Sequence, residues 1–280
     1  MLLKTKIFLI VILSSLFIYS KSYNKIISVS PAITQMIYLF GGQKKLIADT
    51  IYCKFPKDAN NKIKIGSLTT IDIEKIVKLK PDLIVVTPML NINQYKLLKK
   101  LHIKVLVYPQ LKTYKAIADF FIKLSKYFNK TKIAKKIIKN ADIKIKKYSK
   151  LLKTKKKYKV FFQFGAKPLF TVTKDNFLND MLKMANLINI SENSKSGIYS
   201  TEQVVFNNPD FIFITTMGIQ GSKEKSNWLK LKNINAVKNN KIFIVDQYKY
   251  CSPTPIVFTD ALKELILLIH PDLKSKLNYE

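Results

Sequence analysis

The chain has 280 residues, of which 48% are apolar, so it is too hydrophobic for a disordered protein and can bury one large core or two medium-sized ones. Its 2 cysteines and 2 histidines exclude a disulfide scaffold and leave little room for a metal site built from these residues. The net charge of +31 comes from lysines spread over every segment, with no arginine to form a bidentate fork on guanine or phosphate, so we expect no nucleic-acid partner.

Residues 1–22 have the pattern of a signal peptide. Lys4 and Lys6 precede an apolar run at residues 7–19, which is shorter than the roughly 20 residues that span a membrane. Ser20 and Ser22 then offer small residues for cleavage after position 22. We therefore predict an exported, periplasmic protein, and an uncleaved N-terminal anchor is the alternative.

Short apolar strands alternate with helical segments through the rest of the chain. The first strand, residues 25–29, leads to Ser30 and Pro31, a helix start with proline in the first turn. The other predicted strands are residues 45–48, 83–86, 105–107, 159–164, 211–214 and 241–245. This alternation predicts mainly parallel α/β lobes.

One segment of the chain occurs twice. Residues 74–87 read EKIVKLKPDLIVVT and residues 202–215 read EQVVFNNPDFIFIT. Each copy predicts a short helix, stopped by Pro81 or Pro209, and then a buried strand. Chance similarity in a chain rich in isoleucine and lysine is the alternative, but the matched spacing favours two similar lobes.

Between the two copies, residues 131–153 form the most helical stretch of the sequence. Apolar residues recur there every three or four positions, lysines fill the other face, and glycine and proline are absent. The predicted fold class is therefore α/β, with two similar lobes of mainly parallel sheets joined by one long rigid interlobe helix. We assign the N-terminal lobe to residues 23–130, the interlobe helix to 131–156 and the C-terminal lobe to 157–280.

No pattern of a known catalytic site is present. The sequence lacks glycine-rich phosphate loops, a G-x-S-x-G elbow and an H-E-x-x-H motif. His102 and His270 have no acidic or cysteine neighbour at ligand spacing. We therefore predict no catalytic residue, no metal ligand and no catalytic cofactor. An exported two-lobed enzyme that uses Cys53 or Cys251 as a nucleophile is the alternative.

Several motifs agree in order with one family. Residues 25–42, KIISVSPAITQMIYLFGG, resemble the opening of the class III periplasmic binding proteins, which have a helical backbone between their lobes. The similarity continues through residues 49–56 and 80–82 to Trp228 and residues 236–246. The resemblance implies a monomeric receptor that captures a metal chelate (ferric siderophore, haem or cobalamin-type corrinoid). It would deliver this ligand to an ABC importer, a permease dimer with its ATPase.

The resemblance also implies a ligand site in the cleft between the lobes. The positions it assigns to this site are Ser30 and Pro31 at a helix N-terminus and the aromatic residues Tyr52, Phe55, Phe170, Tyr248 and Tyr250. For each aromatic residue the alternative is an ordinary position in the core or on the surface. Arginine is absent, so only lysines such as Lys54, Lys167 and Lys249 could meet an anionic chelate.

The resemblance further assigns permease docking to one glutamate on each lobe, here Glu74 and Glu202. Both stand seven residues before the Pro-Asp pair of the repeat. The alternative is that each carboxylate only stabilises the first turn of its helix. For Cys53 and Cys251, one in each lobe, we predict free thiols.

Overall fold

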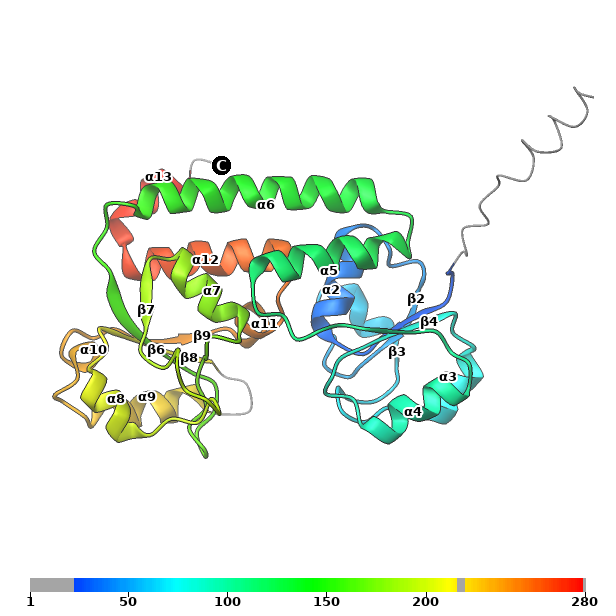
Figure 1. Ribbon diagram of the computed structural model, residues 1–280, viewed down its shortest axis with the longest axis horizontal. Helices are drawn as coiled ribbons and strands as arrows, with labels where there is room; N and C mark the ends of the chain where they lie inside the picture. Colours follow the sequence, from blue (N-terminus) through cyan, green and yellow to red (C-terminus); the bar gives the residue numbers. More distant parts are fainter. Residues whose placement is uncertain (1–22, 216–219, 279–280) are drawn as a thin grey trace, which may run out of the picture.

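The computed structural model describes residues 23–215 and 220–278 and shows two lobes side by side beneath a layer of helices (Figure 1). The N-terminal lobe contains a parallel sheet with the strand order β3-β2-β1-β4-β5. Its strands are β1 (Ile26–Ser28), β2 (Leu46–Asp49), β3 (Ile63–Lys64), β4 (Leu83–Val86) and β5 (Val105–Val107). Its helices are α2 (Pro31–Leu39), the 3₁₀ helix η1 (Lys57–Asn61), α3 (Ile73–Leu79) and α4 (Ile92–Lys100).

The C-terminal lobe repeats this plan with four parallel strands in the order β7-β6-β8-β9. These strands are β6 (Tyr158–Gln163), β7 (Leu187–Asn189), β8 (Phe211–Thr215) and β9 (Ile242–Val245). The helices are α7 (Phe177–Met184), α8 (Thr201–Asn207), α9 (Gly221–Leu229), α10 (Asn235–Lys238) and α11 (Gln247–Cys251). The chain ends in α12 (Pro255–Ile269), η2 (Pro271–Leu273) and α13 (Lys274–Asn278). The α/β fold class predicted from the sequence is confirmed.

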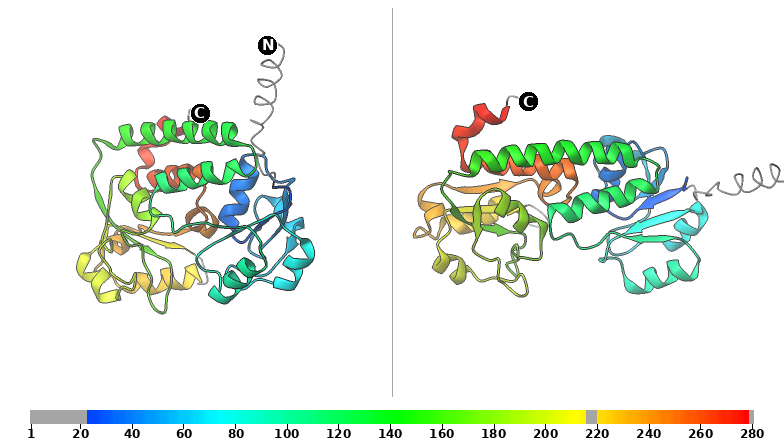
Figure 2. Two further views of the ribbon diagram at one scale, coloured as in Figure 1. Left: turned by 45° about the vertical axis from the view of Figure 1, so that its right-hand side comes forward. Right: turned by 45° about the horizontal axis from the view of Figure 1, so that its top comes forward.

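The predicted interlobe helix is α6 (Thr131–Leu152). Its buried side chains are Ala134, Ala141, Tyr148 and Leu152, and lysines cover its outer face. Two further helices, α5 (Tyr114–Lys126) and α12, pack against α6 and lie between it and the two sheets (Figures 1 and 2). The connection between the lobes is therefore broader than the single helix that the sequence predicted.

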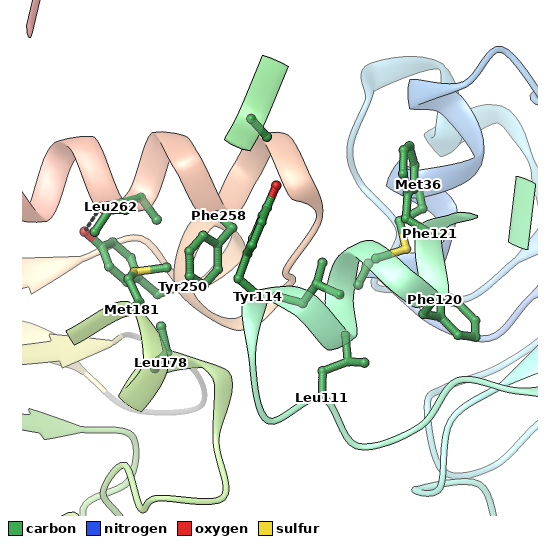
Figure 3. Close-up of a cluster of buried hydrophobic side chains, with 14 of the residues drawn as sticks. Met36, Leu111, Tyr114, Phe120, Phe121, Leu178, Met181, Tyr250, Phe258 and Leu262 are labelled. Atoms are coloured by element: carbon green, nitrogen blue, oxygen red, sulfur yellow. Dashed lines mark hydrogen bonds between the residues drawn. The ribbon is translucent and has the colours of Figure 1, made fainter. Parts of the chain in front are cut away.

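One hydrophobic core runs through this layer into both lobes (Figure 3). At its centre the rings of Tyr114 on α5 and Phe258 on α12 lie 5.0 Å apart, centroid to centroid. Leu178 and Met181 of α7 reach the same cluster from the C-terminal lobe, and Met36 of α2 reaches it from the N-terminal lobe. Because such a core is close-packed, it restricts movement of one lobe against the other.

The repeated segment folds alike in its two copies. In each, the third residue of the motif is buried, Ile76 in α3 and Val204 in α8. Both helices end on a residue in the left-handed conformation, Lys80 with φ 48° and Asn208 with φ 45°. Each is followed by a strand that is buried throughout. The matched conformations support the interpretation that the lobes are structural repeats.

The predicted signal peptide, residues 1–22, lies outside the described residues. Within residues 23–215 and 220–278, no helix has the length and apolar content needed to cross a membrane.

Candidate functional site

Apolar side chains are exposed where strands of both sheets end. The carboxyl ends of parallel strands meet at one edge of a sheet, and this edge is where open α/β folds bind ligands. The exposed apolar residues in these loops are Ile51, Tyr52 and Phe55 after β2, Met89 after β4, Phe170 after β6 and Ile198 after β7. An apolar surface in solvent at this place indicates a binding site.

Two of the predicted aromatic residues meet across the lobes. The ring of Phe55, from the loop after β2, contacts the ring of Tyr248 on α11 edge-on, with centroids 5.1 Å apart and an interplanar angle of 71°. Phe55 nevertheless keeps 52% of its surface exposed, and Tyr248 is half-buried. The loop after β2 in the N-terminal lobe and α11 in the C-terminal lobe therefore lie against each other at this point.

Tyr52 and Phe170 are also exposed, at 45% and 41%. Phe170 lies in a turn in which Phe164 donates its backbone N–H to the carbonyl of Phe170 over 2.8 Å. A Cβ atom on Gly165 would approach the Phe170 ring to 2.9 Å, so a larger residue at this position would displace the ring. These contacts fix the ring of Phe170 at the end of β6.

Ser30 and Pro31 lie at the N-terminus of α2 and both are buried. The Ser30 side chain makes no capping hydrogen bond to the helix backbone. The helix dipole and the N–H groups of the first turn favour an anionic group at such an end.

Tyr250 is in the core, so the prediction that it lines the cleft is wrong. Its side chain is completely buried, its ring packs against Phe162 with centroids 5.6 Å apart, and its hydroxyl donates to the carbonyl of Ala261 over 3.2 Å (Figure 3). Residues 247–251 form a helix and not a loop. Two positions along a helix are separated by about 200°, so Tyr248 and Tyr250 face opposite ways.

The three lysines considered for anionic ligands differ in their surroundings. Lys249 pairs with Glu264 on α12. Lys54 and Lys167 are exposed in the loops after β2 and β6. These two lysines therefore lie on the loops that carry Phe55 and Phe170.

A buried polar cluster beneath residues 50–62 was not anticipated from the sequence. Asp49, at the end of β2, is completely buried, and its Oδ1 lies 2.7 Å from Nζ of Lys64. Its Oδ2 has no hydrogen-bond partner. Burial raises the pKa of Asp49 to about 6, and the nearby ammonium of Lys64 partly opposes this rise. Thr34 and Thr50 contact the buried Sγ of Cys53 in the same cluster, at 3.3 and 3.2 Å.

Both cysteines are free thiols in the structure. Burial raises the pKa of the Cys53 thiol, and it raises the pKa of Cys251 to about 12. A nucleophilic cysteine needs the opposite shift, because the thiolate is the reactive form. Neither cysteine supports the enzyme alternative. In the described part of the chain, no three His, Cys, Asp or Glu side chains gather into a group that could hold a metal ion.

Glu74 and Glu202 are exposed in the first turns of α3 and α8. Both helices lie on the side of the molecule away from α6 (Figure 1). Hydrogen bonds from its own backbone N–H and from Ser200 lower the pKa of Glu202. Beside Glu202 is a shallow hollow of about 390 Å³, lined also by Thr201, Val205, Phe206 and Leu231. Phe206 is 88% exposed there, an unusual position for a large aromatic side chain.

Known proteins similar to this chain in sequence and in fold are periplasmic binding proteins. The sequence pattern of the periplasmic binding protein family matches residues 26–248. The vitamin B12-binding protein of Vibrio vulnificus (strain CMCP6) is 28% identical over 253 residues, which cover 88% of this chain and 90% of that protein. The structure of a possible iron-binding (periplasmic solute-binding) protein from Staphylococcus epidermidis has a TM-score of 0.77 and 28% identity, over 89% of this chain and 100% of that one. A periplasmic haem-binding protein from Pseudomonas aeruginosa is similar in fold alone, with a TM-score of 0.79 and 15% identity over 89% and 93% of the two chains.

Proposed function

Because the chain belongs to the periplasmic binding protein family, whose members are substrate-binding proteins of ABC transporters, we propose that it captures a metal chelate between its lobes and delivers it to an importer. The observation that carries this proposal is the set of exposed aromatic side chains at the strand ends of both lobes, with Phe55 and Tyr248 in contact across them.

The ligand class follows from the chemistry of these loops. Exposed rings such as Tyr52, Phe55 and Phe170 suit the broad apolar faces of a corrinoid, a haem or a siderophore aryl group. Lys54 and Lys167 lie on the same loops and would pair with anionic groups at the rim of the ligand. The B12-binding and iron-binding names of two similar proteins agree with this class.

Docking on the permease would use Glu74 and Glu202. The two carboxylates occupy equivalent places in the repeat, on helices that lie on one side of the molecule (Figure 1). Equivalent acids on two similar lobes suit a partner with two similar subunits. The hollow beside Glu202 adds an apolar contact through Phe206. The protein would act as a monomer, exported by residues 1–22 or anchored by them.

A binding panel tests the proposal. Residues 23–280 are purified and titrated by calorimetry with cyanocobalamin, haemin, a ferric hydroxamate and a ferric catecholate. One of these chelates should bind and stabilise the fold by about 2.7 kcal/mol at a concentration 100 times its Kd. Binding by none of the four chelates would contradict the proposed ligand class.

A further inference from the structure

Lys64 occupies the centre of a group of acceptors beneath residues 50–62, which we call the 50–62 segment. Its Nζ lies 2.7 Å from Asp49 Oδ1, 2.8 Å from the carbonyl oxygen of Ala59 and 3.3 Å from that of Cys53. The Lys64 side chain is 28% exposed, whereas the Asp49 carboxylate is completely buried. One ammonium group therefore joins the end of β2 to two separate points of the segment.

The other side chains that tie this segment to the rest of the protein make single contacts, whereas Lys64 makes three. Residues 50–56 form neither a strand nor a helix, and only η1 follows before β3. Outside the Lys64 group, the N–H of Ile51 donates to the carbonyl of Gly66 over 3.0 Å and the hydroxyl of Tyr38 donates to Asp58 over 2.7 Å. Thr34 contacts the Cys53 thiol, the ammonium of Lys62 donates to the carbonyl of Gln43, and the ring of Phe55 contacts Tyr248. Ile51, Tyr52 and Phe55 each keep about half of their surface exposed, so their own burial contributes only part of what holds the segment. Segments with few buried apolar contacts open at low cost unless polar contacts tie them down.

We propose that Lys64 is a positioning residue of the ligand site: by binding Asp49 and the carbonyls of Ala59 and Cys53, it holds the 50–62 segment in the shape that presents Tyr52 and Phe55. This inference rests on the function proposed above, since that function assigns the ligand to these two rings. Lys64 acts through the segment and does not touch the ligand. A loop held in its binding conformation spares the ligand the cost of ordering it, which raises affinity.

The choice of variant follows from the burial of the ion pair. Replacing Lys64 alone would leave the Asp49 carboxylate buried without its partner, a change that is strongly destabilising in itself. The double variant Asp49→Asn with Lys64→Met removes both charges and the ammonium donor together. Lys159→Met is the matched control, because its ammonium also donates to a backbone carbonyl, that of Asn207, but both residues lie in the C-terminal lobe, away from the segment.

Cys53 reports directly on the segment. Cys53 belongs to the segment and its side chain is completely buried, and Cys251→Ser removes the second thiol from the measurement. In this background the reaction of Cys53 with 5,5′-dithiobis(2-nitrobenzoate) measures opening of the segment. The fluorescence of Trp228, which is buried in the C-terminal lobe, measures whether that lobe is intact, and circular dichroism at 222 nm measures the helices of both lobes.

The double variant should keep the Trp228 emission of the parent and react at Cys53 at least about tenfold faster, while Lys159→Met should react like the parent. The Kd of the double variant for the chelate that the parent binds in the panel should be about tenfold higher than that of the parent. Unchanged Cys53 protection would overturn the proposal, and so would loss of the whole fold, which would make the pair a general element of stability. If the parent binds no chelate, the proposed function is wrong. The reaction rates of Cys53 in the parent and the double variant still show whether Lys64 holds the segment.

Discussion

Asp82 and Asp210 perform the same task in the two lobes. The N–H of Asp82 donates to the carbonyl of Lys25 over 2.8 Å, and its Oδ2 accepts the N–H of Lys25 over 2.9 Å. Asp210 has the same two bonds with Lys159, at the same two distances. Each aspartate therefore joins the start of one central strand, β4 or β8, to the start of its neighbour, β1 or β6. This shared pair of hydrogen bonds explains why the Pro-Asp pair stands at the same place in both copies of the repeat.

These bonds lead to a prediction for stability. Asp82→Asn and Asp210→Asn should each lower the free energy of unfolding by about 1 kcal/mol, because a charge-assisted hydrogen bond to the backbone becomes a neutral one. Urea denaturation followed by Trp228 fluorescence measures the change. Asp119→Asn is the control, since it breaks only an exposed pair with Lys115 and should change stability by less than about 0.5 kcal/mol. Equal losses for all three variants would contradict the special role of Asp82 and Asp210.

The aromatic residues of the strand-end loops lead to a prediction for affinity. Phe55→Ala, Tyr52→Ala and Phe170→Ala should each weaken chelate binding by about tenfold, equivalent to about 1.4 kcal/mol. The free energy of unfolding should change less than for a core residue, because all three residues keep between 41% and 52% of their surface exposed. Calorimetric titration gives the Kd, and thermal unfolding gives the stability.

Two variants serve as controls for these rings. Phe206→Ala removes an exposed ring from α8 and should leave the Kd unchanged. Tyr250→Phe removes a buried hydroxyl that donates to Ala261 and should cost about 1 kcal/mol of stability without altering the Kd. If Tyr250→Phe weakened binding and Phe55→Ala did not, our assignment of the ligand face would be wrong.

The regular elements were readable from the sequence because their patterns are local. All seven predicted strands are present with small shifts at their ends, and the predicted helix at residues 131–153 is α6. The strands β3 and β7 were missed, since both are short and stand at the edges of their sheets, where little burial shapes the sequence. The family resemblance is confirmed by the match over residues 26–248.

Features that depend on tertiary contacts could not be read in this way. Tyr250 was placed in a loop because residues 247–251 carry no clear helical period, and the helix α11 turns its side chain inward. The pair between Asp49 and Lys64 joins neighbouring strands, and β3 was not predicted. The sequence did contain one indication of this pair: Asp49 is an acid at the end of a buried strand, in a chain with only 18 acids.

The raised pKa of Asp49 leads to a prediction for pH dependence. A carboxyl group whose folded pKa is about 6, against an ordinary value of 3.8, stabilises the fold most below pH 3.8 and loses this contribution as the pH rises through 6. Relative to the parent, Asp49→Asn should therefore become progressively more stable from about pH 4 to about pH 6, and the difference should level off above this range. Urea denaturation of both proteins at four pH values measures the difference, in which groups common to the two proteins cancel. Parallel curves would show that Asp49 does not titrate in this range.

Glu74 and Glu202 lead to a prediction for docking on the permease. Both carboxylates are exposed, and charge pairs at an exposed rim mainly set the orientation and association rate of a complex. The variant Glu74→Lys with Glu202→Lys should therefore keep the Kd for the chelate but abolish binding to the permease and uptake in cells. Chelate titration, binding to the purified permease in detergent and uptake of labelled chelate measure the three effects.

A control with the same change in charge separates docking from net charge. Asp119→Lys with Asp272→Lys alters exposed acids on α5 and η2, each of which pairs with a lysine. These pairs contribute little to stability, so the control should fold, bind the chelate and support uptake. If the Glu74 and Glu202 variant transported as well as this control, both glutamates would act only in the first turns of their helices, where a carboxylate stabilises the helix dipole by about 0.3–1 kcal/mol.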